Sequence, residues 1–167
     1  HGYVADRLGD PTARLMGRLT LDPRPHIDPM LSLLVPFILI ITGSPIIFGG
    51  AKPVPVDPFN LKDGRKDLAL VSLAGPLTNI VLAILASLLI KIFQLDAFAL
   101  SGIVGFIAMV LMTTVKINLL LAIFNLLPIP PLDGSKIFAL ILPERQANAY
   151  MSLGSMGFLL VLFLLMV

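Results

Sequence analysis

The residue most indicative of chemical function is Asp133. It lies near the end of the stretch from Asn125 to Gly134, which follows a long apolar run. Ionisable side chains at membrane depth are rare and usually functional, so a metal-binding or catalytic role is one interpretation. The other is a helix N-cap, because nearby prolines end the preceding helix and Asp caps helices well. Leu-Asp-Gly is a common tripeptide, so spacing alone leaves both interpretations open.

The second candidate is His1. The chain opens on His1-Gly2-Tyr3 without an initiator methionine, so we expect it to have been cut from a longer protein. A terminal histidine by itself carries little information, and its context matters more. Residues 1–8 are predicted to be the end of a helix, because Gly9 suits a helix end and Asp10-Pro11 suits the cap and first turn of the next.

Three further polar residues lie within apolar segments. For Asn79 and Asn125, taken singly, we favour an interhelical hydrogen bond, typically worth about 0.6 kcal/mol in membranes. The alternative is that these amides point donors into a polar cavity. Lys116 can snorkel, pair with an acid or line a cavity, and the sequence does not decide among these.

The elements that must position these residues are strongly apolar. The chain has 57% hydrophobic and 13% charged residues, with a mean hydropathy of +0.97, far beyond a soluble domain. Three uncharged stretches, 29–51, 68–90 and 146–167, are long enough to cross a hydrocarbon core of about 30 Å. We therefore predict an all-α, polytopic transmembrane helix bundle with short extended or β segments in its loops, built as a single domain over 1–167.

Charge and cysteine content exclude other classes. Most of the 12 basic residues fall in two segments, 7–24 and 52–66. Basic segments of a membrane protein mark cytoplasmic loops, so the pI near 9.2 does not indicate nucleic-acid binding. The absence of cysteine excludes disulfides and thiolate metal sites within the chain.

We predict membrane spans over 30–50, 68–93 and 146–167, and one long helix or two short ones over 97–127, interrupted at Lys116. Short helices are expected over 11–18 and 134–142, and a short strand over 18–21. The segment 30–50 is the ambiguous one, because a full span would place the two basic segments on opposite sides of the membrane. We favour a full span slightly over a re-entrant hairpin.

Four blocks of this sequence together resemble the site-2 protease family of intramembrane zinc metalloproteases. The similarity is to its small bacterial members, which lack an inserted PDZ domain. No single block is specific, but all four occur in order along nearly the whole chain. The blocks are His1–Ala13, Ala51–Val56, Ala74–Asn79 and Phe124–Gly134.

The resemblance implies a zinc site and a function. In the family, a helix carries His-Glu-x-x-His, whose histidines bind one zinc ion while the glutamate acts as general base. His1 corresponds to the second histidine and Asp133 to the third protein ligand. Asn79 and Asn125 correspond to asparagines that hold the substrate or the oxyanion. The implied activity is cleavage of transmembrane substrates, known as regulated intramembrane proteolysis, in the bacterial inner membrane.

The sequence departs from this pattern at its start. The first histidine would stand four residues before His1 and the glutamate three before it, so the chain contains two of three protein ligands and no general base. We expect a fragment of this kind to bind zinc poorly and to be inactive. Two alternatives stay open: a transporter or channel component, because buried polar residues are typical of these, and a non-catalytic relative that binds membrane proteins.

Overall fold

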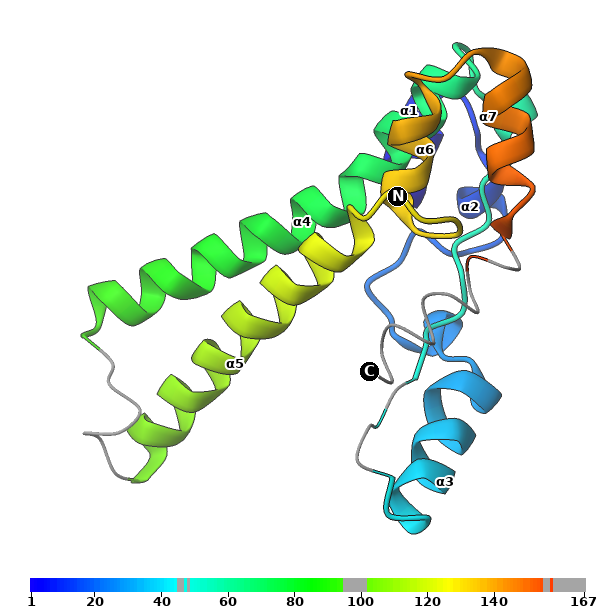
Figure 1. Ribbon diagram of the computed structural model, residues 1–167. Coiled ribbons are helices and arrows are strands. Elements are labelled where there is room, and N and C mark those ends of the chain that lie inside the picture. Colours follow the sequence, from blue (N-terminus) through cyan, green and yellow to red (C-terminus); the bar gives the residue numbers. More distant parts are fainter. Residues whose placement is uncertain (45–46, 48, 95–101, 155–156, 158–167) are drawn as a thin grey trace. The chain divides into compact units, whose positions relative to one another are not determined.

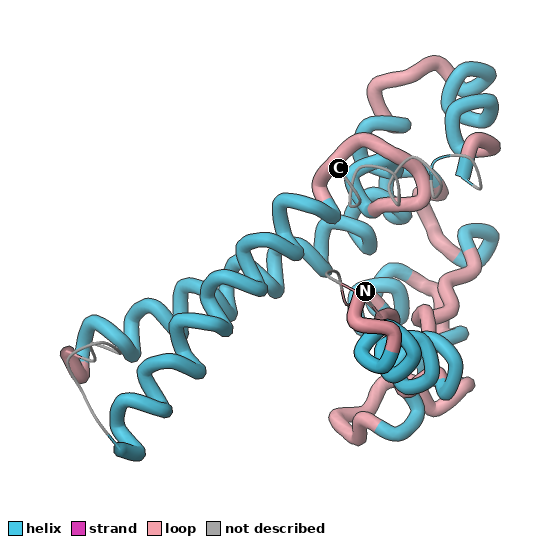
Figure 2. Tube along the Cα trace, turned by 60° about the horizontal axis from the view of Figure 1, so that its bottom comes forward, coloured by secondary structure: helices cyan, strands magenta, loops and turns pink. Residues whose placement is uncertain are grey.

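The computed structural model describes residues 1–44, 47, 49–94, 102–154 and 157 (Figure 1). The described residues form two compact units, one from His1 to Val71 and the other from Ser72 onward. Within these ranges no residue forms a strand (Figure 2), so the predicted all-α class is confirmed there. The α-helices of the described residues are α1 (Gly2–Leu8), α2 (Thr12–Leu15), α3 (Val35–Ile41), α4 (Arg65–Ile92), α5 (Gly102–Asn125), α6 (Asp133–Ala139) and α7 (Glu144–Met151).

The first unit is centred on α1, the helix predicted at the chain start. It ends at Gly9, whose φ of +115° is accessible to glycine but strained for other residues. Ala5, Leu61 and Val71 form a small buried core against it. Gly2 lies so close to its neighbours that an added Cβ would meet Ala13, Leu19 and Val54 at 3.0 Å.

Asp10 holds the turn between α1 and α2 and is fully buried. Its carboxylate accepts hydrogen bonds from the Thr12 backbone at 3.1 Å and from the Thr12 hydroxyl. It also accepts from the Asp57 amide at 2.8 Å and from Asn60 Nδ2 at 3.1 Å. The residue expected only to cap a helix therefore also joins that turn to the short 3₁₀ helix η3 (Pro58–Asn60).

The strand predicted over 18–21 is wrong. Instead, the Arg18 amide donates to Ala13 O at 2.8 Å, which closes the turn after α2. Thr20 Oγ1 then accepts from the Asp22 amide at 3.1 Å. Local side-chain bonds of this kind compete with strand pairing for the backbone donors, and they turn the chain here.

The apolar segment predicted to span over 30–50 is a shorter helix. A π-helix, η2 (Pro29–Leu34), leads into α3, so the helical part ends at Ile41. Its 13 residues measure about 20 Å, well short of a hydrocarbon core of about 30 Å. Gly43, at φ +66°, follows the helix end.

After α3 the chain returns to η2, where the helical segment began. The Gly50 amide donates to Leu31 O at 3.0 Å, and Ser32 Oγ donates to Gly50 O at 2.6 Å. The Lys52 amide donates to His26 O at 2.9 Å. These contacts make 29–52 a hairpin with both ends together, so the preference for a full span is wrong. In a membrane, such a hairpin would keep the two flanking basic segments on one side, as the positive-inside rule favours.

Two helices are long and apolar enough to cross a membrane, judged by length and composition: α4 with 28 residues and α5 with 24. They lie side by side in both views (Figures 1 and 2). Only 17% of the apolar window of α4 and 11% of that of α5 are buried by protein, which distinguishes them from soluble core helices. Lys116 does not interrupt α5, so the single-helix alternative for this region is correct.

After α5 the second unit continues through a proline turn into α6 and α7. The Pro130–Pro131 peptide bond is cis, and the Leu132 amide donates to Ile129 O at 2.8 Å to close the turn. Helix α6 confirms the helix expected over 134–142, although it is shorter. The span predicted over 146–167 begins within α7, and most of it lies outside the described residues.

Candidate metal centre

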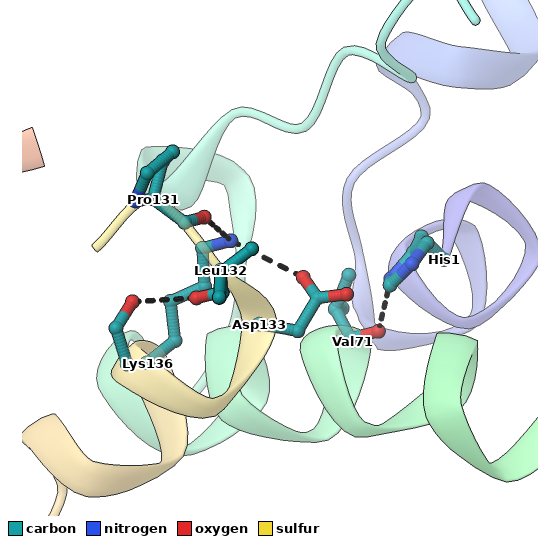
Figure 3. Close-up of polar contacts among 7 residues, drawn as sticks. His1, Val71, Pro131, Leu132, Asp133 and Lys136 are labelled. Carbon is teal, nitrogen blue, oxygen red and sulfur yellow. Dashed lines mark hydrogen bonds and ion pairs between the residues drawn. The ribbon is translucent and has the colours of Figure 1, made fainter. Parts of the chain in front are cut away.

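His1 stands at the N-cap of α1, and its ring is held by the first turns of α4. Its Nδ1 lies 2.8 Å from the carbonyl oxygen of Val71 (Figure 3). These two residues are 70 positions apart in the chain, and Val71 is itself buried in the core of the first unit. The imidazole is therefore oriented by a fixed part of the structure.

This contact determines the tautomer of His1. A carbonyl oxygen can only accept a hydrogen bond, so Nδ1 must carry the proton and donate. If His1 is a metal ligand, the coordinating nitrogen is then Nε2. Metal-binding histidines commonly donate their other ring N–H to a carbonyl or carboxylate, which orients the ring and raises its basicity.

Asp133 is the first residue of α6, and the N-cap position belongs to Leu132. The N-cap interpretation of Asp133 is therefore wrong by one position. Its carboxylate is largely shielded, with 17% of the side chain exposed, and its Oδ1 lies 3.2 Å from Lys136 Nζ. A carboxylate in the first turn of a helix is also favoured by the helix dipole.

The turn that presents Asp133 is held by contacts within the second unit. The hydroxyl of Tyr150 on α7 donates a hydrogen bond to Pro128 O at 2.6 Å. The Tyr150 ring packs edge-on against the ring of Phe138 on α6, with the ring centroids 5.5 Å apart. Gly134 faces the end of α5: a Cβ there would lie 2.6 Å from Leu127 O and still closer to Leu126 O. Only glycine fits this approach of α6 to the backbone.

Lys136 joins the carboxylate to the turn. Its Nζ contacts Asp133 Oδ1 at 3.2 Å and also donates to Pro131 O at 3.3 Å (Figure 3). One ammonium group thus bridges Pro131, in the turn before α6, and the candidate ligand on α6. Sequence reasoning overlooked Lys136, although its position three residues after Asp133 on a predicted helix was a usable signal.

Asn79 and Asn125 are both half-buried, the former on α4 and the latter the last residue of α5. Neither amide side chain hydrogen-bonds to another described residue. Asn125 directly precedes the turn that leads to Asp133. A side-chain amide has two N–H donors, and an oxyanion-binding residue requires at least one.

Across the described ranges, no three His, Cys, Asp or Glu side chains gather into a metal-binding cluster. The assignment of His1 and Asp133 as metal ligands therefore remains a prediction from the sequence. The donor types fit zinc, because imidazole nitrogen and carboxylate oxygen are both common zinc ligands. The N–H of His1 is already committed to Val71 O, as such a ligand requires.

Comparison with known proteins places the chain among peptidases. Residues 36–166 match the profile of peptidase family M50, a range that includes Asn79, Asn125 and Asp133. The chain is 36% identical over 170 residues to "Putative zinc metalloprotease YwhC" of Bacillus subtilis, covering 98% of this chain and 72% of that protein.

Two further relatives carry the same type of name. "Putative zinc metalloprotease Rip2" of Mycobacterium tuberculosis is 36% identical over 171 residues, covering 98% of this chain and 60% of that protein. "Putative zinc metalloprotease MJ0611" of Methanocaldococcus jannaschii is 38% identical over 107 residues, covering 63% of this chain and 49% of that protein. No solved structure matches the chain.

Proposed function

Because the chain belongs to peptidase family M50, the site-2 protease family, we propose that it forms the membrane-embedded catalytic part of a zinc endopeptidase that cleaves transmembrane segments of other proteins. The observation that carries the proposal is the hydrogen bond from His1 Nδ1 to Val71 O, which prepares Nε2 for a metal. The two apolar helices α4 and α5 support a multi-pass protein in the bacterial cell membrane.

In this proposal His1 Nε2 and an Asp133 oxygen hold the zinc ion. When bound, zinc supplies an acidified water and polarises the scissile carbonyl. Val71 keeps the imidazole in the correct tautomer, and Lys136 holds the carboxylate in its orientation. In the family motif His-Glu-x-x-His, the first histidine supplies the remaining protein ligand and the glutamate the general base.

The asparagines would bind the reacting peptide. Asn125 Nδ2 or Asn79 Nδ2 donates to the carbonyl oxygen of the scissile bond, on which negative charge develops during attack. A single preorganised donor of this kind is worth roughly 3 kcal/mol in the transition state. The matched family consists of peptidases, so the transporter alternative receives no support from it.

The test is Asp133→Asn in a chain expressed with the complete His-Glu-x-x-His motif before Gly2. Zinc content is measured after purification, and proteolysis is measured on a reporter with one transmembrane helix interrupted by glycine and proline. We expect zinc retention to fall by at least about 100-fold and cleavage to be lost, because one of three protein ligands is impaired.

The matched control is Asp63→Asn, which neutralises an exposed carboxylate in the loop before α4 and should leave both readouts unchanged. Undiminished proteolysis in Asp133→Asn would show that Asp133 is not a ligand. If wild-type protein retains zinc but cleaves no reporter, the non-catalytic alternative gains support.

A further inference from the structure

A cavity of about 230 Å³ lies between the two membrane-crossing helices. Ser87 and Ile90 of α4 line one side, and α5 supplies the other with Met112, Val115 and Lys116. The polar groups of this lining are one hydroxyl and one ammonium, set among apolar side chains. Lys116, whose role the sequence left open, therefore lines a cavity.

A second lysine, Lys91, does not line the cavity but lies close to it along α4. Lys91 follows Ser87 by four residues on α4, which puts both on one helical face, and it lies in the last turn of that helix. No ion pair of Lys91 or Lys116 occurs within the part of the chain that the structure describes. Lys116 therefore lines the cavity, and Lys91 lies one helical turn beyond Ser87.

A positively charged side chain between two apolar membrane helices costs free energy unless it pairs with an anion or reaches the membrane surface. Lys91 lies in the last turn of α4, one turn after Ser87, and a helix that crosses a membrane ends near the lipid headgroups. Phospholipid phosphates lie at this depth, with the acyl chains extending inward. The apolar walls formed by Ile90, Met112 and Val115 suit the upper part of such a chain.

We propose that the α4–α5 cavity binds the phosphate of an anionic phospholipid, with Lys116 and Lys91 providing charge and the Ser87 hydroxyl a hydrogen bond. Basic pockets between transmembrane helices are a general solution for anionic headgroups. The site uses none of the candidate metal ligands, so it stands independently of the proposed proteolytic function.

The test compares lipid retention by the full-length protein in a neutral maltoside detergent. Equal amounts of phosphatidylglycerol and phosphatidylcholine with the same acyl chains are added, and bound lipids are counted by native mass spectrometry. We expect wild-type protein to retain phosphatidylglycerol preferentially. Lys116→Gln should lower that preference about five-fold, and Lys91→Gln/Lys116→Gln should abolish it. The reason is that each of the two lysines contributes a similar share of the attraction to the anionic headgroup.

Lys116→Arg should keep the preference, and Lys62→Gln, an equal charge change in an exposed loop, should not alter it. Equal phosphatidylglycerol retention by wild type and Lys116→Gln would overturn the proposal. Thermal unfolding in phosphatidylcholine alone verifies that each variant is folded.

Discussion

At the residue scale, backbone carbonyls orient the candidate metal ligands. Val71 O receives the imidazole of His1, and Pro131 O receives the ammonium that holds Asp133. A carbonyl in a packed turn or helix moves little, so it defines the direction of the side chain bound to it. Such outer contacts are typical of metal sites, where they fix ligand geometry before the metal arrives.

Lys136→Met tests the outer contact of Asp133. The substitution keeps an unbranched side chain of similar length but removes the ammonium from Asp133 Oδ1 and Pro131 O. We expect zinc affinity to fall about 10-fold, the lower range for loss of an outer-shell partner, with a parallel fall in kcat/KM. Lys136→Arg should restore most of both. Unchanged zinc affinity in Lys136→Met would mean that the turn orients the carboxylate without Lys136.

Asp10 predicts a pH dependence. Burial alone raises the pKa of Asp10, but hydrogen bonds from Thr12, Asp57 and Asn60 outweigh it, so the pKa lies below 3.8. The stabilisation is therefore fully present above pH 3.8 and is lost as pH falls through the lowered pKa. Asp10→Asn turns an acceptor into a donor beside the Thr12, Asp57 or Asn60 donors and should cost about 1–3 kcal/mol at neutral pH.

The measurement for Asp10 is the difference in unfolding free energy between wild type and Asp10→Asn across pH. That difference should be constant near neutrality and shrink below pH 3.8, where the wild-type carboxylate becomes protonated. Comparing two variants cancels the titration of the other carboxylates. A difference that is independent of pH would contradict the assigned direction of the pKa.

At the element scale, α6 is positioned by its contact with the end of α5. Gly134→Ala would place a Cβ against Leu126 O and Leu127 O, so α6 and the adjoining Asp133 must shift. Overpacking of this kind costs about 1–3 kcal/mol. We expect lower thermal stability together with weaker zinc retention. Gly154→Ala, where an added Cβ meets nothing within 4 Å, is the control and should behave as wild type in both measurements.

The predicted and observed elements differ mainly where the chain reverses. Apolar length correctly indicated α4 and α5, because a helix satisfies its own backbone hydrogen bonds within lipid. The same criterion failed for 30–50. Its glycines and prolines were visible, but the contact of Gly50 with Leu31 that makes it a hairpin was not.

At the scale of the whole molecule, the hairpin 29–52 determines the membrane topology of the first unit. Because the chain contains no cysteine, single cysteines can report sidedness. Leu21→Cys, before the hairpin, and Lys62→Cys, after it, are both exposed positions. We expect a membrane-impermeant maleimide to label both from the same side of sealed vesicles. Thr42→Cys, at the far end of the helix, should be protected from that side.

Labelling of Leu21→Cys and Lys62→Cys from opposite sides would show that the segment 30–50 crosses the membrane once. Each variant is compared with detergent-solubilised protein, in which all three cysteines should react. This comparison separates protection by the membrane from protection by folding. The outcome also decides whether both basic segments obey the positive-inside rule.

The sequence by itself determined the helical membrane class, the family and the identities of the candidate residues. These follow from local composition, from apolar length and from short motifs such as Leu-Asp-Gly before a predicted helix. Only the tertiary structure decided that 29–52 reverses, that Val71 O sets the tautomer of His1, and that Gly134 must lack a side chain. Most of these features join groups that are distant in the chain, up to 70 residues apart for His1 and Val71, so no local pattern encodes them.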